Sequence, residues 1–121
     1  MAKRILAVDD EPDILSMMES WLGDLGFEVL SAANGEKAFK MAREEKPNLI
    51  ILDIMLPKMN GYKVCGLLKK DSRYAKIPII LFSARVQEED KRLGQEVGAD
   101  AYVSKPFEPD ALLGKIQALI Q

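Results

Sequence analysis

Residues 49–61 read Leu-Ile-Ile-Leu-Asp-Ile-Met-Leu-Pro-Lys-Met-Asn-Gly. The unbroken apolar run Leu49–Leu52 is typical of a short strand that is buried on both faces, as in a parallel sheet. The pair Asn60 and Gly61 is a turn signal, and beyond it apolar residues recur at helical spacing. The stretch therefore predicts a strand, a loop and a helix, with one carboxylate, Asp53, at the end of the strand.

The same alternation runs along the rest of the chain. Four more short apolar runs predict strands at Ile5–Val8, Val29–Ala32, Ile77–Phe82 and Ala101–Val103. Between and after the strands, apolar residues at helical spacing predict five helices. The fourth helix, at about residues 88–97, has only Leu93 and Val97 as strong apolar positions. We therefore expect it to be the most loosely held of the five.

Five strands that alternate with five helices predict an α/β fold. Such a fold is a parallel sheet with helices on both faces and right-handed crossovers. The commonest five-stranded solution is the doubly wound, flavodoxin-like order 2-1-3-4-5. In these sheets a ligand binds beyond the carboxyl ends of the strands, where the strand order reverses, which here lies between the first and third strands. No linker or repeat interrupts the pattern, so we expect one domain over residues 1–121.

Composition narrows the classes of function. The chain has 121 residues, 30% of them charged, and a net charge of −2, so it offers no electrostatic footprint for nucleic acid or an anionic membrane. The N-terminal apolar run is too short for a signal peptide or a membrane span. Cys65 is the only cysteine, which rules out an intrachain disulfide and fits a reducing cytoplasm. The chain has no histidine, so imidazole chemistry must come from a partner.

Polar residues stand at the carboxyl ends of four predicted strands. They are Asp9 and Asp10 after the first strand, Asp53 after the third, Ser83 after the fourth and Lys105 after the fifth. In the expected order the first and third strands are neighbours, so three carboxylates converge. A hard divalent cation such as Mg²⁺, together with the lysine, would offset their repulsion. Phosphoryl transfer needs alignment and charge neutralisation, and a carboxylate forms acyl phosphates, so the pattern predicts a phosphoryl-accepting site at Asp53.

Each of these residues also has a plainer explanation when it is taken alone. Asp10 could cap the first helix, Ser83 could cap the fourth, and Lys105 could be a solvated surface charge. Their joint occurrence at strand ends, in the right order, favours the functional interpretation. Trp21 and Cys65 lie in helical patterns, and we expect them to be packing residues. If Trp21 were exposed, it would instead mark a surface on which a kinase docks.

The chain resembles the receiver domain of bacterial two-component response regulators along essentially its whole length. The matching segments are ILAVDDEP at 5–12, LIILDIMLPKMNG at 49–61, IILFSA at 79–84, which ends in Ala84, and GADAYVSKPF at 98–107. The chemotaxis member of this family has the strand order expected above. The resemblance implies a phosphoacceptor switch that assists its own phosphorylation and dephosphorylation, not an enzyme that releases a product.

The resemblance also implies a role for each matched residue. It implies that Asp53 accepts the phosphoryl group and that Asp9, Asp10, Asp53 and the backbone carbonyl of Met55 hold Mg²⁺, for which Mn²⁺ can substitute. It implies that Lys105 and the Ser83 hydroxyl bind the phosphoryl group and that the peptide bond before Pro106 is cis. Pro57 and Gly61 belong to the loop and helix start beyond Asp53. Ser83 stands where threonine is common, and Met55 and Arg85 stand where family members tune the lifetime of the acyl phosphate.

A phosphohistidine on a sensor histidine kinase or a histidine phosphotransfer protein is the implied donor. Once Asp53 is phosphorylated, Ser83 is expected to shift toward it and the ring of Tyr102 to turn inward. This would remodel the surface formed by the fourth helix, the fifth strand and the fifth helix, and so control binding of a downstream protein. The chain stops just after the fifth helix, which leaves a stand-alone receiver or one cut from a longer regulator with an effector domain, and we lean slightly to the first.

Three rival classes remain open. A phosphatase of the haloacid dehalogenase type would need an acid two residues after the nucleophile, where this chain has Met55. A flavodoxin-like electron carrier would need a hydroxyl- and glycine-rich loop after the first strand, where this chain has Asp-Asp-Glu-Pro. A degenerate receiver would bind partners without phosphorylation, but the full residue set argues against it. Acetyl phosphate, Mg²⁺ and the mass of the intact protein would separate these classes.

Overall fold

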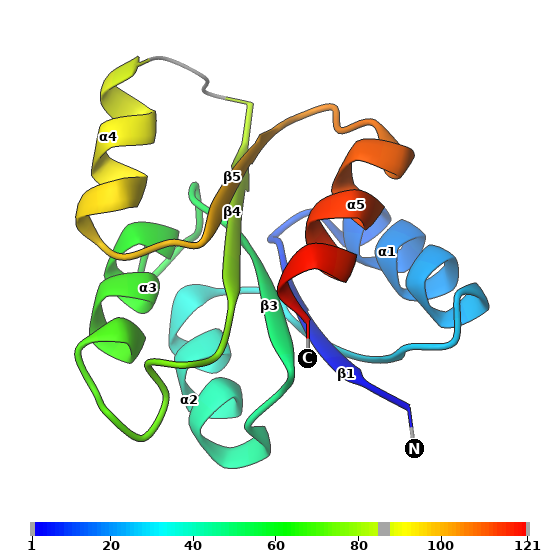
Figure 1. Cartoon of the computed structure of the whole chain (residues 1–121), viewed down its shortest axis with the longest axis horizontal. Coiled ribbons are helices and arrows are strands. Elements are labelled where there is room, and N and C mark those ends of the chain that lie inside the picture. The colour runs from blue at the N-terminus through cyan, green and yellow to red at the C-terminus, as the bar shows by residue number, and fades with distance from the viewer. Residues whose placement is uncertain (1, 85–87, 121) are drawn as a thin grey trace.

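The structure is a computed structural model that describes residues 2–84 and 88–120. Strands and helices alternate along the chain (Figure 1). The strands are β1 (Arg4–Val8), β2 (Glu28–Ala32), β3 (Leu49–Asp53), β4 (Ile79–Ser83) and β5 (Ala101–Ser104). The helices are α1 (Pro12–Asp24), α2 (Gly35–Glu45), α3 (Gly61–Lys69), α4 (Glu88–Glu96) and α5 (Pro109–Leu119). The predicted alternation of strands and helices is confirmed.

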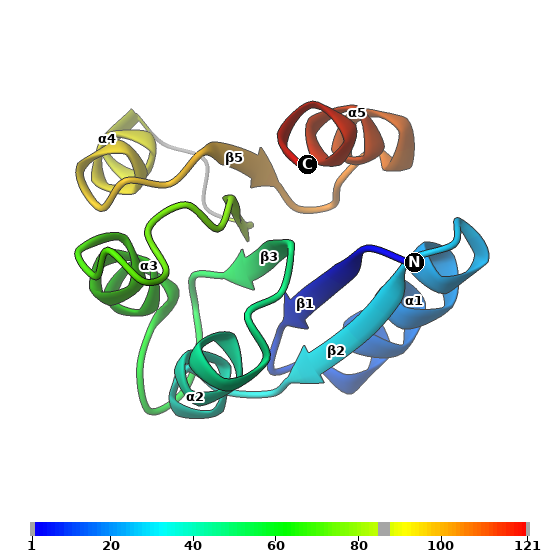
Figure 2. The same ribbon diagram turned by 60° about the horizontal axis from the view of Figure 1, so that its bottom comes forward.

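The five strands form one parallel sheet in the order β2-β1-β3-β4-β5. This is the predicted doubly wound order, so β1 and β3 are neighbours and the order reverses beside them. Every residue of β3 and β4 is buried, which is why their sequences are continuous apolar runs. The arrows of β1, β2 and β3 point the same way in Figure 2, as the parallel pairing requires.

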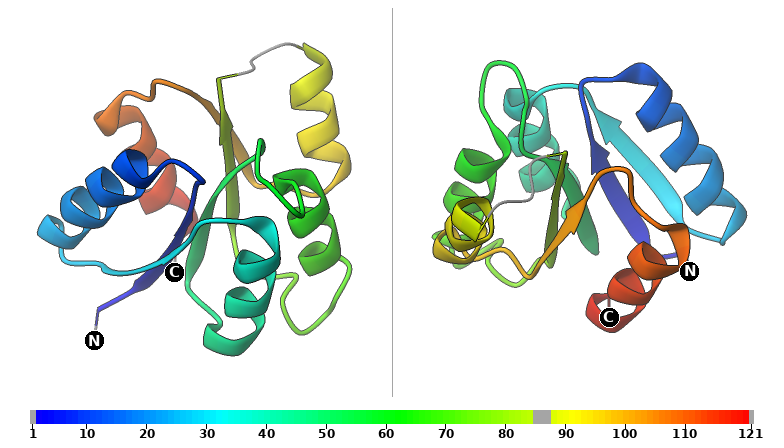
Figure 3. Two further views of the ribbon diagram at one scale, coloured as in Figure 1. Left: turned by 180° about the vertical axis from the view of Figure 1, so that it is seen from behind. Right: turned by 90° about the horizontal axis from the view of Figure 1, so that it is seen from above.

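The helices cover both faces of the sheet (Figure 3). One hydrophobic core lies between the sheet and helices α1 and α5, and contains Met18, Leu22, Leu112 and Ile116. A second core lies between the other face and α2 and α3, and contains Ala38, Ala42, Val64 and Leu68. Alternate residues of each strand serve the two cores, as the period-2 geometry of a strand requires: Ile5 and Ala7 face the first, and Leu6 and Val8 the second.

The start of the fourth strand differs most from the sequence prediction, whereas the other strand boundaries differ by at most one residue. We predicted that the fourth strand begins at Ile77, but β4 begins at Ile79. The Ile77 amide donates to the carbonyl of Tyr74 in a turn (3.0 Å), and Pro78 has no amide hydrogen to give to a ladder. The Pro78 carbonyl nevertheless accepts from the Ile50 amide (2.9 Å), so the residue leads into the sheet without belonging to the strand.

Asparagine side chains start two of the helices. The side chain of Asn34 accepts from the Lys37 amide (2.8 Å) at the start of α2, and that of Asn60 accepts from the Lys63 amide (3.0 Å) at the start of α3. These are N-caps, which satisfy amides that have no partner within the helix. The pair Asn60 and Gly61, a turn signal in the sequence, is therefore also the start of the helix that follows β3, and Asn34 and Gly35 do the same after β2.

Candidate functional site

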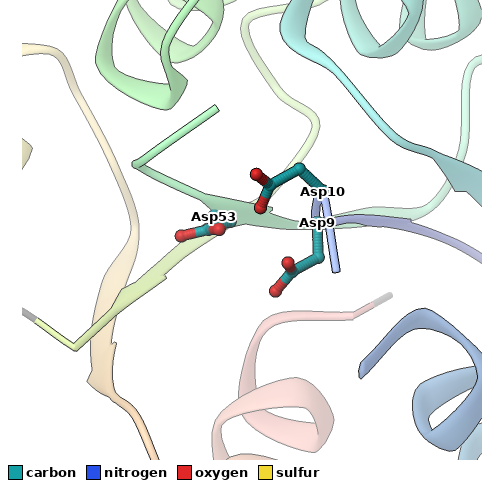
Figure 4. A group of neighbouring side chains, drawn as sticks. All are labelled: Asp9, Asp10 and Asp53. Atoms are coloured by element: carbon teal, nitrogen blue, oxygen red, sulfur yellow. The ribbon is translucent and has the colours of Figure 1, made fainter. Parts of the chain in front are cut away.

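Three carboxylates meet at the edge of the sheet where β1 and β3 end (Figure 4). Asp9 and Asp10 follow β1, and Asp53 is the last residue of β3. Each offers an oxygen atom within 4.8 Å of those of the other two. Asp9 and Asp53 are buried, whereas Asp10 is exposed. The predicted convergence of the three side chains is thus what the fold produces, because parallel neighbours end at the same edge.

Backbone amides two residues further along the chain hold the two buried carboxylates in place. The Glu11 amide donates to Oδ1 of Asp9 (2.9 Å), and the Met55 amide donates to Oδ1 of Asp53 (3.3 Å). Asp10 does not cap helix α1, since the N-cap position is Glu11 and no side chain makes the capping bond. The exposed Asp10 carboxylate is therefore left to face the other two acids across the site.

Lys105 brings a positive charge into the acidic cluster. Its Nζ donates to Oδ2 of Asp9 (2.8 Å) and to Oδ2 of Asp53 (3.3 Å), and lies 3.8 Å from Oε1 of Glu11. The Lys105 amide also donates to the carbonyl of Ser83 (2.8 Å), which ties the β5–α5 loop to the end of β4. The peptide bond between Lys105 and Pro106 is cis, as the resemblance implied.

The charges in the site act on one another. Burial, and next the charge of Asp9, raises the pKa of Asp53, although Lys105 and the Met55 amide act in the opposite direction. Burial by itself would lower the pKa of Lys105, but its hydrogen bond to Asp9 and the charge of Asp53 outweigh that effect, and its pKa is raised. The lysine is therefore firmly protonated, and it offsets only part of the negative charge.

Ser83 and Tyr102 lie on the neighbouring strands β4 and β5. Ser83 is buried at the end of β4, followed by the exposed Ala84. Tyr102, on β5, is half-buried and packs against the core beneath α2 and α3. A Cβ added to Gly94 of α4 would lie 3.3 Å from the Tyr102 ring, so the ring rests against that helix. The structure brings Ser83 to the edge of the site and does not bring the Tyr102 ring among the carboxylates.

The loop from β3 to α3 returns close to the backbone at the end of β3. Met55 is exposed, and Gly61 donates its amide to the carbonyl of Ile54 (3.0 Å). A Cβ at Gly61 would lie 2.3 Å from the carbonyl oxygen of Asp53, so only glycine allows α3 to begin this close to the strand. The exposed Pro57 accepts from the amides of Met59 (2.8 Å) and Gly35 (3.4 Å). Arg85, which we linked to acyl phosphate lifetime, lies outside the described residues.

Sequence reasoning missed three residues at the site. Glu11 approaches Lys105, and the acidic run from Asp9 to Glu11 could have signalled it. Phe82 lies under the Lys105 ammonium, at 4.8 Å from its ring centroid, and nothing in a buried apolar strand marked it. Gly35 begins α2 against the loop, since a Cβ there would overlap the Met59 carbonyl, but its Asn-Gly pair signalled only a turn.

Trp21 and Cys65 are packing residues, as predicted. Trp21 is half-buried against the α1–α5 core, with its ring 5.9 Å from that of Phe107. Cys65 is fully buried in the other core, and burial raises the pKa of its thiol to about 12. A buried thiol that stays protonated is an inert packing group.

The donor set of the acidic cluster suits a hard divalent cation. All three side chains supply carboxylate oxygens, which Mg²⁺ prefers to nitrogen or sulfur, and the exposure of Asp10 leaves room for the waters that Mg²⁺ keeps. The cluster is therefore able to hold a metal ion.

Across the described ranges 2–84 and 88–120, no helix combines the length and the hydropathy that a membrane crossing requires.

Fold and site together define a class: doubly wound α/β domains with a carboxylate cluster, fitted to a divalent cation, at the switch point of the sheet. Comparison with protein families identifies the member of that class. Residues 5–117 match the model of the response regulator receiver domain, and the chain belongs to this family. Receiver domains are signalling switches of two-component systems that respond to phosphorylation.

Curated relatives and solved structures agree with this assignment. The chain is 42% identical over its whole length to the alkaline phosphatase synthesis transcriptional regulatory protein PhoP of Bacillus subtilis, and covers 50% of that protein. It is 40% identical to the DNA-binding response regulator MtrA of Mycolicibacterium smegmatis, of which it covers 52%. The chain thus spans about half the length of these relatives. The structure of chemotaxis protein CheY4 of Vibrio cholerae is similar, with a TM-score of 0.92, 33% identity and coverage of 99% of this chain and 100% of that one.

Proposed function

We propose that Asp53 accepts a phosphoryl group from a phosphohistidine on a partner histidine kinase or histidine phosphotransfer protein. The observation that carries the proposal is the Lys105 ammonium, which donates to both Asp9 and Asp53 at the centre of the carboxylate cluster. A carboxylate beside a fixed positive charge has a neighbour that can neutralise the oxygens of an incoming phosphoryl group. Membership in the receiver family supports the same assignment.

The proposed phosphoryl transfer forms one bond to phosphorus and breaks another. An oxygen of Asp53 forms a bond to phosphorus, the bond between phosphorus and the donor nitrogen breaks, and the imidazole leaves with the electron pair and takes up a proton. Lys105 donates hydrogen bonds to the phosphoryl oxygens and keeps its proton, and the Ser83 hydroxyl donates to another oxygen. Hydrolysis by water later restores the Asp53 carboxylate.

Asp9, Asp10 and Asp53, with the backbone carbonyl of Met55, are the groups that would hold Mg²⁺ or Mn²⁺. When bound, the ion supplies positive charge against the phosphoryl oxygens and the neighbouring carboxylates. The remaining work belongs to the chain itself. Backbone amides orient the buried carboxylates, and the tight β3–α3 loop sets the position of Met55.

The product of the reaction is a changed surface. Phosphorylation adds a charged group to a buried site, and we propose that Ser83 shifts toward it and that the Tyr102 ring turns inward. The Tyr102 ring now rests against α4 at Gly94, so its movement would alter the contact between α4 and β5. The surface of α4, β5 and α5 would then bind a downstream protein or an effector domain of the same protein.

Intact-mass measurement tests the phosphoacceptor role. The chain is incubated with acetyl phosphate and Mg²⁺, and it should gain the mass of one phosphoryl group. Asp53→Asn should abolish the gain. Asp24→Asn, at an exposed position at the end of α1, should keep it and serves as the matched control. A mass gain that survives Asp53→Asn would contradict the proposal, and steady release of phosphate from varied organic phosphates would favour a phosphatase.

NMR spectroscopy with beryllofluoride and Mg²⁺ tests the switch. The phosphoryl mimic should change the chemical shifts of Tyr102 and of α4 as well as those of the site. Changes confined to the pocket would contradict the proposed movement. A receiver domain of RstA from Klebsiella pneumoniae, described as BeF3-activated, has a similar structure, with a TM-score of 0.89 and 29% identity.

For the partners of the whole protein we rely on the names of its relatives, and what we infer from them is a proposal. The relatives PhoP and MtrA carry names of transcriptional and DNA-binding regulators, and this chain matches half of each. We propose that the present residues do not bind DNA themselves, because their net charge is −2. They would act in the cytoplasm, where a single buried thiol is kept reduced.

A further inference from the structure

The Lys105 ammonium lies between two carboxylates and an aromatic face. Its Nζ is 2.8 Å from Oδ2 of Asp9 and 3.3 Å from Oδ2 of Asp53. The same atom lies 4.8 Å from the centroid of the Phe82 ring. This distance is within the range of a cation–π contact, in which the negative face of the ring attracts the cation. The described contacts of the ammonium are thus made on one side to acids and on another to a ring.

Phe82 is itself held rigidly. The residue is fully buried in β4, where it stands opposite Asp53 in the parallel ladder, and its carbonyl accepts from the Ile54 amide (3.2 Å). The Phe107 ring meets it edge to face, with centroids 6.5 Å apart and an angle of 80° between the planes. The ring is therefore a fixed platform beside the strand end that carries the acceptor.

A lysine needs such a platform more than an arginine would. Its ammonium is a point charge on a flexible stem, without the fork geometry that fixes a guanidinium on its partner. Glu11 offers a competing carboxylate, with Oε1 3.8 Å from Nζ and an exposed side chain. A lysine that moved out toward Glu11 would approach solvent and leave Asp53.

We propose that Phe82 is a positioning residue for phosphoryl transfer, because its ring holds the Lys105 ammonium at Asp53 by a cation–π contact. This role rests on the proposed phosphoacceptor function. In transfer from acetyl phosphate, an oxygen of Asp53 bonds to phosphorus, the bond from phosphorus to the acetate oxygen breaks, and acetate leaves with the electron pair. Phe82 touches none of these atoms and acts only through Lys105.

Two replacements separate the electrostatic face of the ring from its shape. Phe82→Leu removes the ring and keeps an apolar side chain, and pentafluorophenylalanine in place of Phe82 keeps the ring shape but reverses its quadrupole. We expect both to slow phosphorylation of Asp53 by acetyl phosphate in saturating Mg²⁺ by roughly 3- to 30-fold, the range that loss of a partly desolvated cation–π contact predicts. Intact mass as a function of time gives the rate.

A control variant tests for a general loss of structure, and a chemical-shift measurement tests the contact itself. Ile116→Val removes one methyl group from the same core on α5, and it should lower thermal stability slightly while the rate stays unchanged. The proton shifts of the Lys105 ε-methylene group report the contact directly. The ring current of Phe82 should displace them in the wild type, and Phe82→Leu should remove that displacement.

The outcomes are distinct. Wild-type phosphorylation rates in both variants would overturn the positioning role. A wild-type rate with the fluorinated ring and a slow rate with leucine would also overturn it, because the shape of the ring alone would then suffice. A Lys105 ε-methylene shift that does not depend on Phe82 would also overturn it. Absence of any mass gain in the wild type would overturn the phosphoacceptor function itself, whereas a phosphorylated wild type with unaffected variants would overturn only the role of Phe82.

Discussion

At the scale of single residues, the acidic site is a balance between burial and charge. Asp53 is 3% exposed and has a carboxylate neighbour in Asp9, and both conditions disfavour its ionised form. Lys105 favours that form from the other side, at 3.3 Å. The raised pKa of Asp53 records that the first two effects prevail. A site with unrelieved negative charge is suited to receive a cation.

The pH dependence of stability should reveal this balance. A carboxyl group whose pKa is higher in the folded than in the unfolded chain holds its proton more tightly when folded, so its ionisation favours unfolding. Without Mg²⁺ at neutral pH, Asp53→Asn should therefore have a higher free energy of unfolding than the wild type. The difference should shrink as the pH falls through the raised pKa of Asp53, and disappear well below the ordinary value of 3.8. Urea denaturation across this pH range measures the difference in the free energy of unfolding. A variant that is less stable than the wild type at neutral pH would contradict the expectation.

Strand-end chemistry was predictable from sequence, whereas the contacts of long side chains were not. Asp9, Asp10 and Asp53 were placed together because parallel neighbours end at one edge, which topology alone dictates. The contacts of Lys105 with Glu11 and Phe82 depend on the path of a flexible side chain. Periodicity marks Phe82 as buried, but it contains no information on which atom lies over the ring.

At the scale of secondary structure elements, helix starts fix the loops around the site. α3 begins so close to β3 that a side chain at Gly61 would collide with the backbone of Asp53 and Ile54. The sequence showed an Asn-Gly turn there, and the structure gives the additional reason, close approach of two backbones. The late start of β4 has a similar local cause, the missing amide hydrogen of Pro78, which an apolar pattern does not register.

A pair of glycine substitutions tests the close approach. Gly61→Ala should lower the free energy of unfolding by about 1–3 kcal/mol, the usual effect of overpacking. Gly114→Ala is the matched control, since a Cβ there meets nothing within 4 Å in α5. It should raise the free energy of unfolding by up to about 1 kcal/mol, because alanine is the better helix former. Chemical denaturation of both variants measures these changes. Equal changes in the free energy of unfolding would contradict the role given to Gly61.

Helix α4 is the element with the smallest apolar anchor, as the sequence predicted. Leu93 and Val97 are only half-buried, and the described part of the helix buries Asp90 and Gly94. The phenol of Tyr62 on α3 donates to the backbone carbonyl of Asp90 (3.1 Å), which links α4 to its neighbour. A polar link of this kind can be broken at modest cost, which would suit the change proposed for the contact between α4 and β5.

Hydrogen exchange should therefore distinguish α4 from α3. We expect the amides of α4 to exchange faster than those of α3 in the wild type, because α3 buries Val64, Cys65 and Leu68. Tyr62→Phe removes a bond with a net value of about 1 kcal/mol and should speed exchange in α4 roughly fivefold. Exchange in α1 should stay unchanged. Equal protection of α3 and α4 in the wild type would refute the argument.

At the scale of the whole molecule, the sheet order turns residues that are distant in sequence into one site. Two hydrophobic cores enclose the sheet from both faces, and both contain residues from β1, β3 and β4. The strand ends are therefore fixed by the most deeply buried part of the molecule. A ligand at these ends is bound by the folded state and not by the unfolded chain, so binding must stabilise the fold.

Magnesium should report this coupling. A ligand at a hundred times its Kd stabilises the folded state by about 2.7 kcal/mol, so MgCl2 should raise the Tm of the wild type in a concentration-dependent way. Asp10→Asn should remove most of the rise, and because Asp10 is exposed the variant should fold normally. Thermal denaturation with increasing MgCl2 measures both proteins. A rise of the same size in the variant would show that the ion acts elsewhere.

The hydrogen bond between Lys105 and Asp9 joins residues that are 96 positions apart in the chain. During synthesis on a ribosome, the first three strands and Asp53, the proposed acceptor, emerge before Lys105 does. A nascent or prematurely terminated chain would hence carry the aspartate without the lysine that completes its surroundings. The full surroundings proposed for phosphorylation of Asp53 would thus form only after synthesis has passed Lys105, although Asp53 itself is made 52 positions earlier.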